Sequence, residues 1–127
     1  MMTHIHTAQV SISNYDDALA FYTGTLGWDK REDVPMGGEG RWLTVGIPGA
    51  TTGVSLAGPG MHDDRTPGGY TGIQVVTDDI EADFDRLSAA GVTFTQPVAT
   101  EPSGDKATWF VDPDGNQFYL IQSAQPT

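Results

Sequence analysis

Few side chains of this 127-residue chain could carry acid–base or metal chemistry. The chain has no cysteine, which excludes disulfides, thiol nucleophiles and cysteine-based zinc sites. His4 and His6 share one face of a predicted strand, while His62 lies in a long loop that nothing places near them. One histidine cannot hold a metal alone, and neither a histidine–carboxylate pair nor a Ser–His–Asp arrangement is evident. We therefore predict no catalytic residue, no metal ligand and partly exposed N-terminal histidines.

Aromatic side chains on predicted strands are stronger candidates for a functional surface. Trp42 and Trp109 lie within strands, as does Tyr119. Strand alternation places Trp42 and Thr44 on one face, opposite an apolar set that should pack under a helix: Leu43, Val45 and Ile47. By the same logic Ser55 joins the face of Trp42 and Thr44. The alternative is that both tryptophans only fill the core or a subunit interface.

The composition narrows the class of ligand. Six Lys and Arg against 17 Asp and Glu give a formal net charge of −11. Nucleic acid requires a basic face, so it is not expected as a partner, and neutral or cationic ligands are favoured. The alternative is that the acidity only maintains solubility. We expect a cytoplasmic protein with no membrane partner, because the sequence shows neither an apolar run of membrane length nor a secretory signal.

The elements that must position these side chains follow from periodicity and turn residues. A closing hairpin is predicted around Asp112-Pro113-Asp114-Gly115, where proline and glycine supply turn geometry. Helices are expected to begin at the caps Asn14 and Asp78, the latter with Glu81 as a capping box, and to end at Gly27 and Gly91. The expected strands are 4–13, 28–34, 41–47 and 52–56, then 70–77, 92–98, 106–111 and 117–122.

The two halves repeat. Asn14 and Asp78 are 64 residues apart, and so are Gly27 and Gly91. The sequence therefore predicts an α+β fold of two tandem βαβββ modules, about 1–58 and 69–127, within one domain. Loop 59–68 joins the modules as a linker or as a lid. Each module would place one helix on one face of a four-stranded sheet, and two such sheets would curve into a cup with the helices outside.

This arrangement resembles the vicinal oxygen chelate superfamily, which includes glyoxalase I, extradiol dioxygenases and bleomycin-resistance proteins. The resemblance covers nearly the whole chain. Its most specific pieces are Ala18-Leu19-Ala20-Phe21-Tyr22 with Leu26-Gly27, the turn Val111-Asp112-Pro113-Asp114-Gly115-Asn116, and Leu120-Ile121. The resemblance implies a cup-shaped sheet whose concave face holds a small molecule, in many members together with a divalent metal.

The resemblance also implies four inward strand positions, where metal-dependent relatives place their ligands. Here they fall on Thr7, or His6 if the strand shifts by one residue, and on Ser55, Gly72 and Tyr119. These residue types are not a ligand set for zinc, nickel, iron or a hard cation, so we predict no metal and no cofactor. The cavity should instead bind through a polar and aromatic lining: Thr7, Trp42, Thr44, Ser55, Trp109, Gln117 and Tyr119.

The resulting expectation is a metal-independent binding protein similar to the bleomycin-resistance branch. It would sequester a planar, neutral or cationic small molecule such as an antibiotic. The alternative is a lyase, isomerase or dioxygenase of the same superfamily, either metal-dependent or using Tyr119 or His6 as acid–base. A scaffold or regulatory role is a third possibility that no residue supports. By resemblance the protein is expected to be a homodimer.

Overall fold

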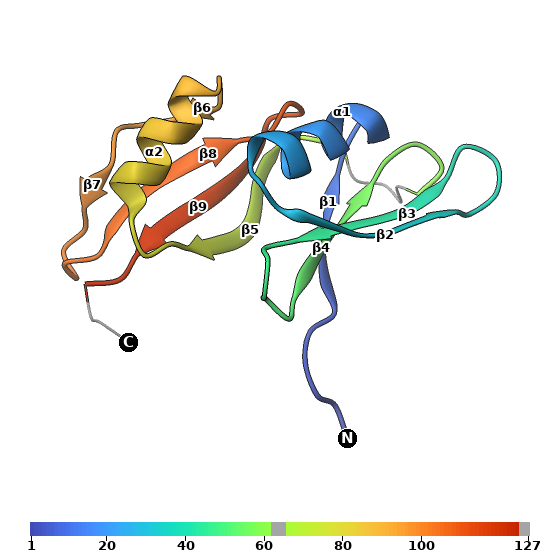
Figure 1. Cartoon of the computed structure of the whole chain (residues 1–127), viewed down its shortest axis with the longest axis horizontal. Coiled ribbons are helices and arrows are strands. Elements are labelled where there is room, and N and C mark those ends of the chain that lie inside the picture. Colours follow the sequence, from blue (N-terminus) through green and yellow to red (C-terminus); the bar gives the residue numbers. More distant parts are fainter. Residues whose placement is uncertain (62–65, 125–127) are drawn as a thin grey trace. The chain divides into compact units, whose positions relative to one another are not determined.

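Each half of the chain forms one β-sheet with one helical segment in the computed structural model of the protein (Figure 1). The structure describes residues 1–61 and 66–124. The chain divides into two compact units, Met1–Gly68 and Gly69–Thr127, here called the first and second modules. No helix among the described residues is long and apolar enough to cross a membrane. His62 and the centre of loop 59–68 lie outside the described residues.

The first module is a βαβββ unit. Its elements are β1 (Thr7–Ser11), α1 (Tyr15–Leu19), the π-helical turn η1 (Ala20–Thr25), β2 (Asp29–Pro35), β3 (Arg41–Gly46) and β4 (Gly53–Ala57). The strand order is β1-β4-β3-β2, with β1 parallel to β4 and the other pairs antiparallel. The predicted strand 4–13 is thus shortened at both ends, whereas the other three strands agree with prediction to within one residue at each end.

The helical segment of the first module begins and ends where the sequence predicts. The Asn14 side chain accepts a hydrogen bond from the Asp17 N–H at 2.9 Å, and Gly27 takes a positive φ of 82°. The segment is not α-helical throughout, because the Leu26 N–H bonds to the carbonyl of Phe21, five residues back. The Thr23 hydroxyl donates to the Leu19 carbonyl at 2.6 Å, which competes with the regular backbone bond.

Helix α1 lies over one face of the first sheet (Figure 1), and the apolar core of the first module lies on that face. Its buried side chains come from three strands, the helical segment and the β1–α1 connection: Val10, Ile12, Ala18, Tyr22, Leu43, Val45, Val54 and Leu56. The prediction that Ile47 joins this core is wrong. Strand β3 ends at Gly46, so alternation no longer fixes the direction of the next side chain, and Ile47 is exposed.

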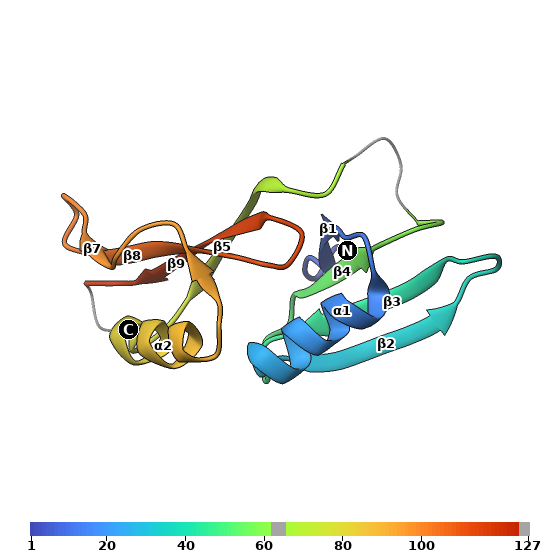
Figure 2. The same ribbon diagram turned by 90° about the horizontal axis from the view of Figure 1, so that it is seen from above.

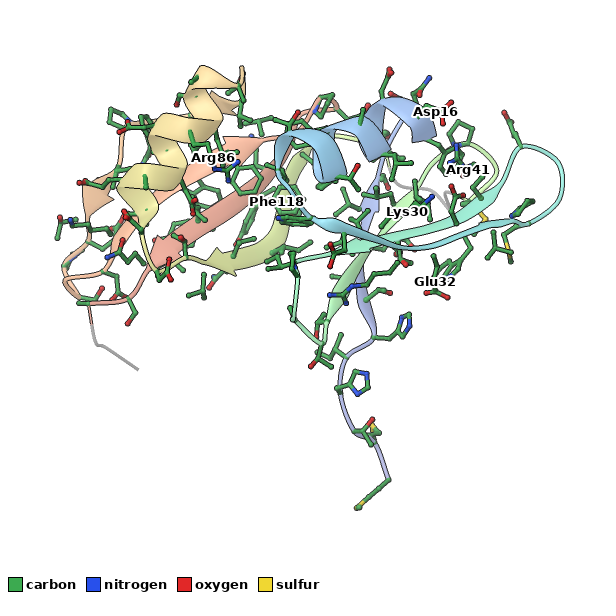
Figure 3. All side chains as sticks on the ribbon, viewed as in Figure 1. Asp16, Lys30, Glu32, Arg41, Arg86 and Phe118 are labelled. Atoms are coloured by element: carbon green, nitrogen blue, oxygen red, sulfur yellow. The ribbon has the colours of Figure 1, made fainter. Side chains whose placement is uncertain are left out.

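Arg41 links the start of α1 to strand β2. Its guanidinium pairs with Asp16 at 2.9 Å and with Asp33 at 2.8 Å, as Figure 3 shows for Asp16 and Arg41. The same group lies over the Tyr15 ring, 5.2 Å from its centroid. Hydrogen bonding to Arg41 lowers the pKa of the Asp33 carboxyl below its ordinary value. Arg41 is therefore a cross-strand anchor whose charge already faces two carboxylates.

The second module repeats the βαβββ order with one broken strand. Its elements are β5 (Gly69–Val76), α2 (Ile80–Ala89), β6 (Thr93–Phe94), β7 (Ala99–Thr100), β8 (Lys106–Val111) and β9 (Asn116–Gln122). The order is β5-β9-β8-β6, and β7 also pairs with β8. Figure 2 shows α2 along one face of the β8–β9 hairpin. The predicted closing hairpin and the α+β fold of two modules are confirmed.

Two local predictions in the second module are wrong. Of the predicted strand 92–98 only Thr93–Phe94 is a strand (β6), and a second short strand, β7, follows it at Ala99–Thr100. The two are separated because Pro97 lacks an N–H and the Thr108 hydroxyl donates to the Gln96 carbonyl at 2.7 Å. The cap of α2 is Asp79 and not Asp78, since the Asp79 carboxylate accepts from the Ala82 N–H at 3.1 Å. The Thr77 hydroxyl accepts the Asp79 N–H, which delays entry into the helix by one residue.

Candidate functional site

In each module the sheet face opposite the helix, here called the open face, carries the predicted site residues. Paired residues of neighbouring strands point to the same side of a sheet, so the register assigns side chains to faces. In the first module one polar row crosses all four strands of the open face: Gln9, Ser55, Thr44 and Glu32. Figure 3 shows Glu32 on the side of β2 away from α1 and Lys30 on the α1 side.

All four candidate residues of the first module share this open face. Thr44 and Ser55 belong to the polar row. Trp42 lies two residues before Thr44 on β3, and Thr7 lies two residues before Gln9 on β1. Thr44 is only 1% exposed and Ser55 5%, so their hydroxyls form the floor of the surface. Trp42 and Thr7 are half-buried and offer the accessible contacts. Gln9, which pairs with Ser55, is missing from the predicted set, although alternation from Thr7 would have found it.

A bulge in β2 brings Arg31 and Glu32 to the open face together. The register of β2 against β3 shifts between Lys30 and Glu32, which leaves Arg31 as an extra residue. The Arg31 guanidinium donates to three carbonyls of the β3–β4 turn, at 2.6 to 3.3 Å: Ile47, Ala50 and Thr51. It occupies the space that a side chain on Gly46 would need. The absence of a side chain at Gly46 therefore lets the Arg31 guanidinium reach the carbonyls of the β3–β4 turn.

The structure brings together a histidine–carboxylate pair that the sequence did not reveal. The Nε2 atom of His6 lies 3.8 Å from Oε1 of Glu32, which also accepts a hydrogen bond from the Thr44 hydroxyl at 3.3 Å. The His6 ring stacks on Trp42, with 6.4 Å between centroids and 23° between planes. His6 precedes the first residue of β1, so strand alternation did not predict its direction. The pair was not evident from the sequence, because the contact depends on the tertiary structure.

The open face of the second module carries a row of three aromatic rings. The Trp109 ring lies 4.9 Å from the Tyr70 ring and 4.8 Å from the Tyr119 ring, both in edge-on arrangements. Trp109 pairs with Tyr119 across β8 and β9, and Tyr70 pairs with Gln117 across β5 and β9. Tyr70 is 54% exposed, and the other two rings are partly exposed. The three second-module candidates, Trp109, Gln117 and Tyr119, thus lie together on one accessible face.

The position assigned to Gly72 differs from expectation. The register of β5 against β9 shifts between Tyr70 and Gln74, and Gly72 lies in this bulge with a φ of 79°. As a result Gln74, and not Gly72, pairs with Tyr119. Periodicity could not reveal this, because two extra residues preserve the alternation on either side of the bulge. In both modules, therefore, a glutamine on the first strand pairs with the candidate residue on the fourth strand. Gln9 pairs with Ser55, and Gln74 pairs with Tyr119.

Burial and neighbouring carboxylates both act on Tyr119. Burial raises the pKa of its phenol above the ordinary value, and the charges of Glu101 and Asp105, together with Tyr70, raise it further. Glu101 and Asp105 close the β7–β8 hairpin, where the Glu101 N–H bonds to the Asp105 carbonyl at 2.7 Å. Tyr119 at neutral pH is therefore a neutral ring with a hydroxyl donor, in a negative local potential that favours a cation.

We expect Tyr119 to titrate above the ordinary tyrosine range. The folded state favours the neutral phenol, which stabilises the protein relative to the unfolded chain. This stabilisation is complete below about pH 10, the ordinary pKa of tyrosine, and is lost as the pH rises through the raised pKa of Tyr119. Ultraviolet difference titration of tyrosinate should lose one step above the ordinary tyrosine range in Tyr119→Phe. Tyr15→Phe, which removes a phenol of the first module, should retain that step. Loss of the step in Tyr15→Phe instead would contradict the assignment.

Comparison with known proteins agrees with the fold. Residues 4–120 match the model of the Glyoxalase/Bleomycin resistance protein/Dioxygenase superfamily. The chain belongs to this superfamily. The superfamily assignment and the fold class predicted from sequence are thereby confirmed.

Two solved superfamily structures are similar over almost their whole length. A member from Sphaerobacter thermophilus DSM 20745 is 45% identical, with a TM-score of 0.91 over 96% of this chain and 98% of that one. TnmS3, an antibiotic binding protein from Streptomyces sp. CB03234, is 35% identical, with a TM-score of 0.85 over 97% and 98%. Among curated proteins, the uncharacterised YurT of Bacillus subtilis (strain 168) is 33% identical over 93% of this chain and 98% of its own.

The divalent metal held by many superfamily members does not fit the residues present. Thr7, Ser55 and Tyr119 offer hydroxyls, and Gln74, which pairs with Tyr119 in place of Gly72, offers one neutral amide, whereas transition-metal sites are built mainly from imidazole, carboxylate or thiolate ligands. Within residues 1–61 and 66–124, no group of three or more histidines or carboxylates is placed to hold an ion. The donor chemistry of this glyoxalase-superfamily protein therefore suits stacking and hydrogen bonding.

Proposed function

We propose that this protein is a metal-independent small-molecule-binding protein that sequesters a planar, neutral or cationic compound such as an antibiotic. The aromatic row of Tyr70, Trp109 and Tyr119 is the observation that carries this proposal. A flat molecule gains both buried apolar area and specific ring geometry against such a row. The antibiotic-binding neighbour TnmS3 supports it by similarity along nearly the full chain.

Charge and hydrogen bonding refine the class of ligand. The carboxylates of Glu101 and Asp105 act on the same phenol that lines the row, so a positive group near Tyr119 would be attracted. Gln117 lies beside the rings on the same face and offers both a donor and an acceptor for the edge of a ligand. The net charge of −11 acts in the same direction at longer range.

The first module supplies a second set of proposed ligand contacts. Thr7, Trp42, Thr44 and Ser55 share its open face, where Trp42 provides the ring and the buried hydroxyls provide a polar floor. We also propose that the two modules form one domain, that the protein is a homodimer and that it acts in the cytoplasm. Size-exclusion chromatography with light scattering checks the homodimer, since a monomeric mass would contradict it.

A second candidate function, metal-free acid–base catalysis, is favoured by the His6–Glu32 pair. A carboxylate 3.8 Å from an imidazole could orient it as a base. Tyr119 suits the base role poorly, because its raised pKa keeps the phenol protonated at neutral pH. Binding and catalysis are separated by recovery of the bound compound, since sequestration returns it unchanged. Stoichiometric nickel, zinc or iron in protein purified without a His tag would contradict both metal-free proposals.

The binding proposal is tested by calorimetry with two planar probes, cationic proflavine and neutral acridone. We expect proflavine to bind and Trp109→Ala to weaken its binding about tenfold to hundredfold, because the central ring of the row is lost. Tyr119→Phe, which keeps its ring, should change affinity only a few-fold. Trp28→Phe is the matched control, since Trp28 contacts Tyr22 of the helix-covered core. Failure of both probes to bind, or unchanged binding by Trp109→Ala, would contradict the proposal.

A further inference from the structure

The His6 imidazole contacts two groups on the open face of the first module that together suit a cation. Its Nε2 atom lies 3.8 Å from the Glu32 carboxylate, and its ring stacks on the Trp42 indole. We infer that Glu32 and Trp42 form a subsite for a planar cationic group of the ligand, and that His6 occupies this subsite until the ligand displaces it. The inference rests on the proposed small-molecule binding and specifies which chemical group of the ligand binds between Glu32 and Trp42.

The chemistry of the two partners selects the occupant. A carboxylate forms charge-assisted hydrogen bonds with planar cations such as amidinium or guanidinium, and an indole face attracts the same cations through its quadrupole. The imidazole of His6 is itself a planar ring with an N–H donor at its edge, so His6 marks the position and orientation that a planar cationic group would take. A neutral group of the same shape would gain the stacking contact and lose the charge.

The neighbouring residues leave Glu32 available to a ligand. Arg31 is adjacent in the chain, but its guanidinium is held by carbonyls of the β3–β4 turn. Among the described residues, the buried Thr44 hydroxyl donates a hydrogen bond to Glu32, which orients the carboxylate without neutralising it. Gln9 and Ser55 continue the polar row toward β1 and offer neutral donors and acceptors next to the cation.

His6 can leave this position without a change in the fold. Its carbonyl accepts the Gly53 N–H at 2.9 Å, and the carbonyl of Ile5 accepts the Thr52 hydroxyl at 2.9 Å, so the backbone is anchored independently of the ring. The side chain of His6 is 67% exposed and that of Glu32 is 43% exposed. An exposed ion pair changes an equilibrium constant by roughly fivefold at most, so rotation of one side chain opens the subsite at small cost.

The test uses the full chain, labelled with ¹⁵N, and two isosteric probes: benzamidinium, a planar cation, and neutral benzamide. The indole N–H signal of Trp42, assigned with Trp42→Phe, reports occupancy. Benzamidinium should shift this signal saturably and bind about two- to fivefold more tightly than benzamide. Glu32→Gln should weaken benzamidinium about two- to fivefold, to the level of benzamide. The matched control Glu39→Gln, in the exposed β2–β3 turn, should bind like the wild type.

Substitution of His6, which is proposed to occupy the subsite in the absence of ligand, tests its role separately. His6→Ala should bind benzamidinium about two- to fivefold more tightly, because competition by the imidazole is lost. Equal binding of both probes, or wild-type affinity in Glu32→Gln with a folded amide spectrum, would overturn the subsite. Equal or weaker binding in His6→Ala would overturn the displacement. The Trp109 indole signal and Trp109→Ala report on the second module, so failure of the aromatic-row proposal is distinguished from failure of this one.

Discussion

Phe118→Ala is expected to destabilise the protein by about 3–5 kcal/mol, the largest effect of any single substitution considered for this chain. Phe118 is fully buried on the helix-covered face of the second sheet (Figure 3). Its ring stacks on Phe110 with 5.1 Å between centroids, and the contacts continue through Phe94 to Phe84 of α2. Truncation leaves a cavity at the end of this chain of rings. Because small domains are stable by only about 5–15 kcal/mol, the loss should be easily measured.

Urea denaturation followed by circular dichroism checks this prediction. Phe118→Leu keeps most of the apolar volume and should cost less than about 2 kcal/mol. Tyr70→Ala removes an aromatic residue from the open face of the same sheet, where the ring is largely exposed, and should cost less than the core truncation. Equal loss of stability in Tyr70→Ala and Phe118→Ala would show that the helix-covered face is not the dominant core of the second module.

Asp112→Ala is expected to destabilise the protein by about 2–4 kcal/mol, through the turn that closes the β8–β9 hairpin. One oxygen of the buried Asp112 carboxylate accepts the N–H groups of Asp114 and Asn116, each at 2.9 Å, and the other accepts the Asn116 side-chain amide at 2.8 Å. The substitution removes the acceptors of three hydrogen bonds at a buried site. This turn joins the strands that carry Trp109 and Tyr119, so binding should weaken together with stability.

The control for Asp112→Ala exchanges the hydrogen-bond donor and acceptor between Asp112 and Asn116. Asp112→Asn alone keeps one carbonyl oxygen for the two backbone N–H groups but can set its amide against the amide of Asn116. Adding Asn116→Asp restores a donor–acceptor pair with the direction reversed. We expect the double variant to recover at least half of the stability lost in Asp112→Asn. A double variant less stable than either single variant would show that the side-chain pair does not support the turn.

Most of the fold follows from local patterns in the sequence. The cap at Asn14, the stop at Gly27 and the turn at Asp112-Pro113-Asp114-Gly115 each depend on residues within a few positions, so their geometry is encoded locally. The errors have two sources. Thr77 shifts the start of α2 by one residue through a local hydrogen bond from the Asp79 N–H to its hydroxyl, whereas Thr108 of β8 bridges the break between β6 and β7 from another strand.

The candidate site was also predictable from the sequence only in part. Alternation within single strands was enough to group Trp42 with Thr44, and Tyr119 with Gln117, because side-chain direction in a regular strand has a period of two. The row of Gln9 with Ser55 and the pairing of Gln74 with Tyr119 depend on the register between strands far apart in sequence. No local pattern encodes that register where β5 contains a bulge.

By itself the sequence determined the repeated βαβββ modules, the superfamily and the types of residue available for a site. Only the tertiary structure decided that His6 meets Glu32 and Trp42, and that three rings line up on the second sheet. The physical reason is the range of the forces involved. Caps, turns and strand alternation act over a few residues, whereas bulges, cross-strand register and the path of a segment outside a strand are set by packing between distant parts of the chain.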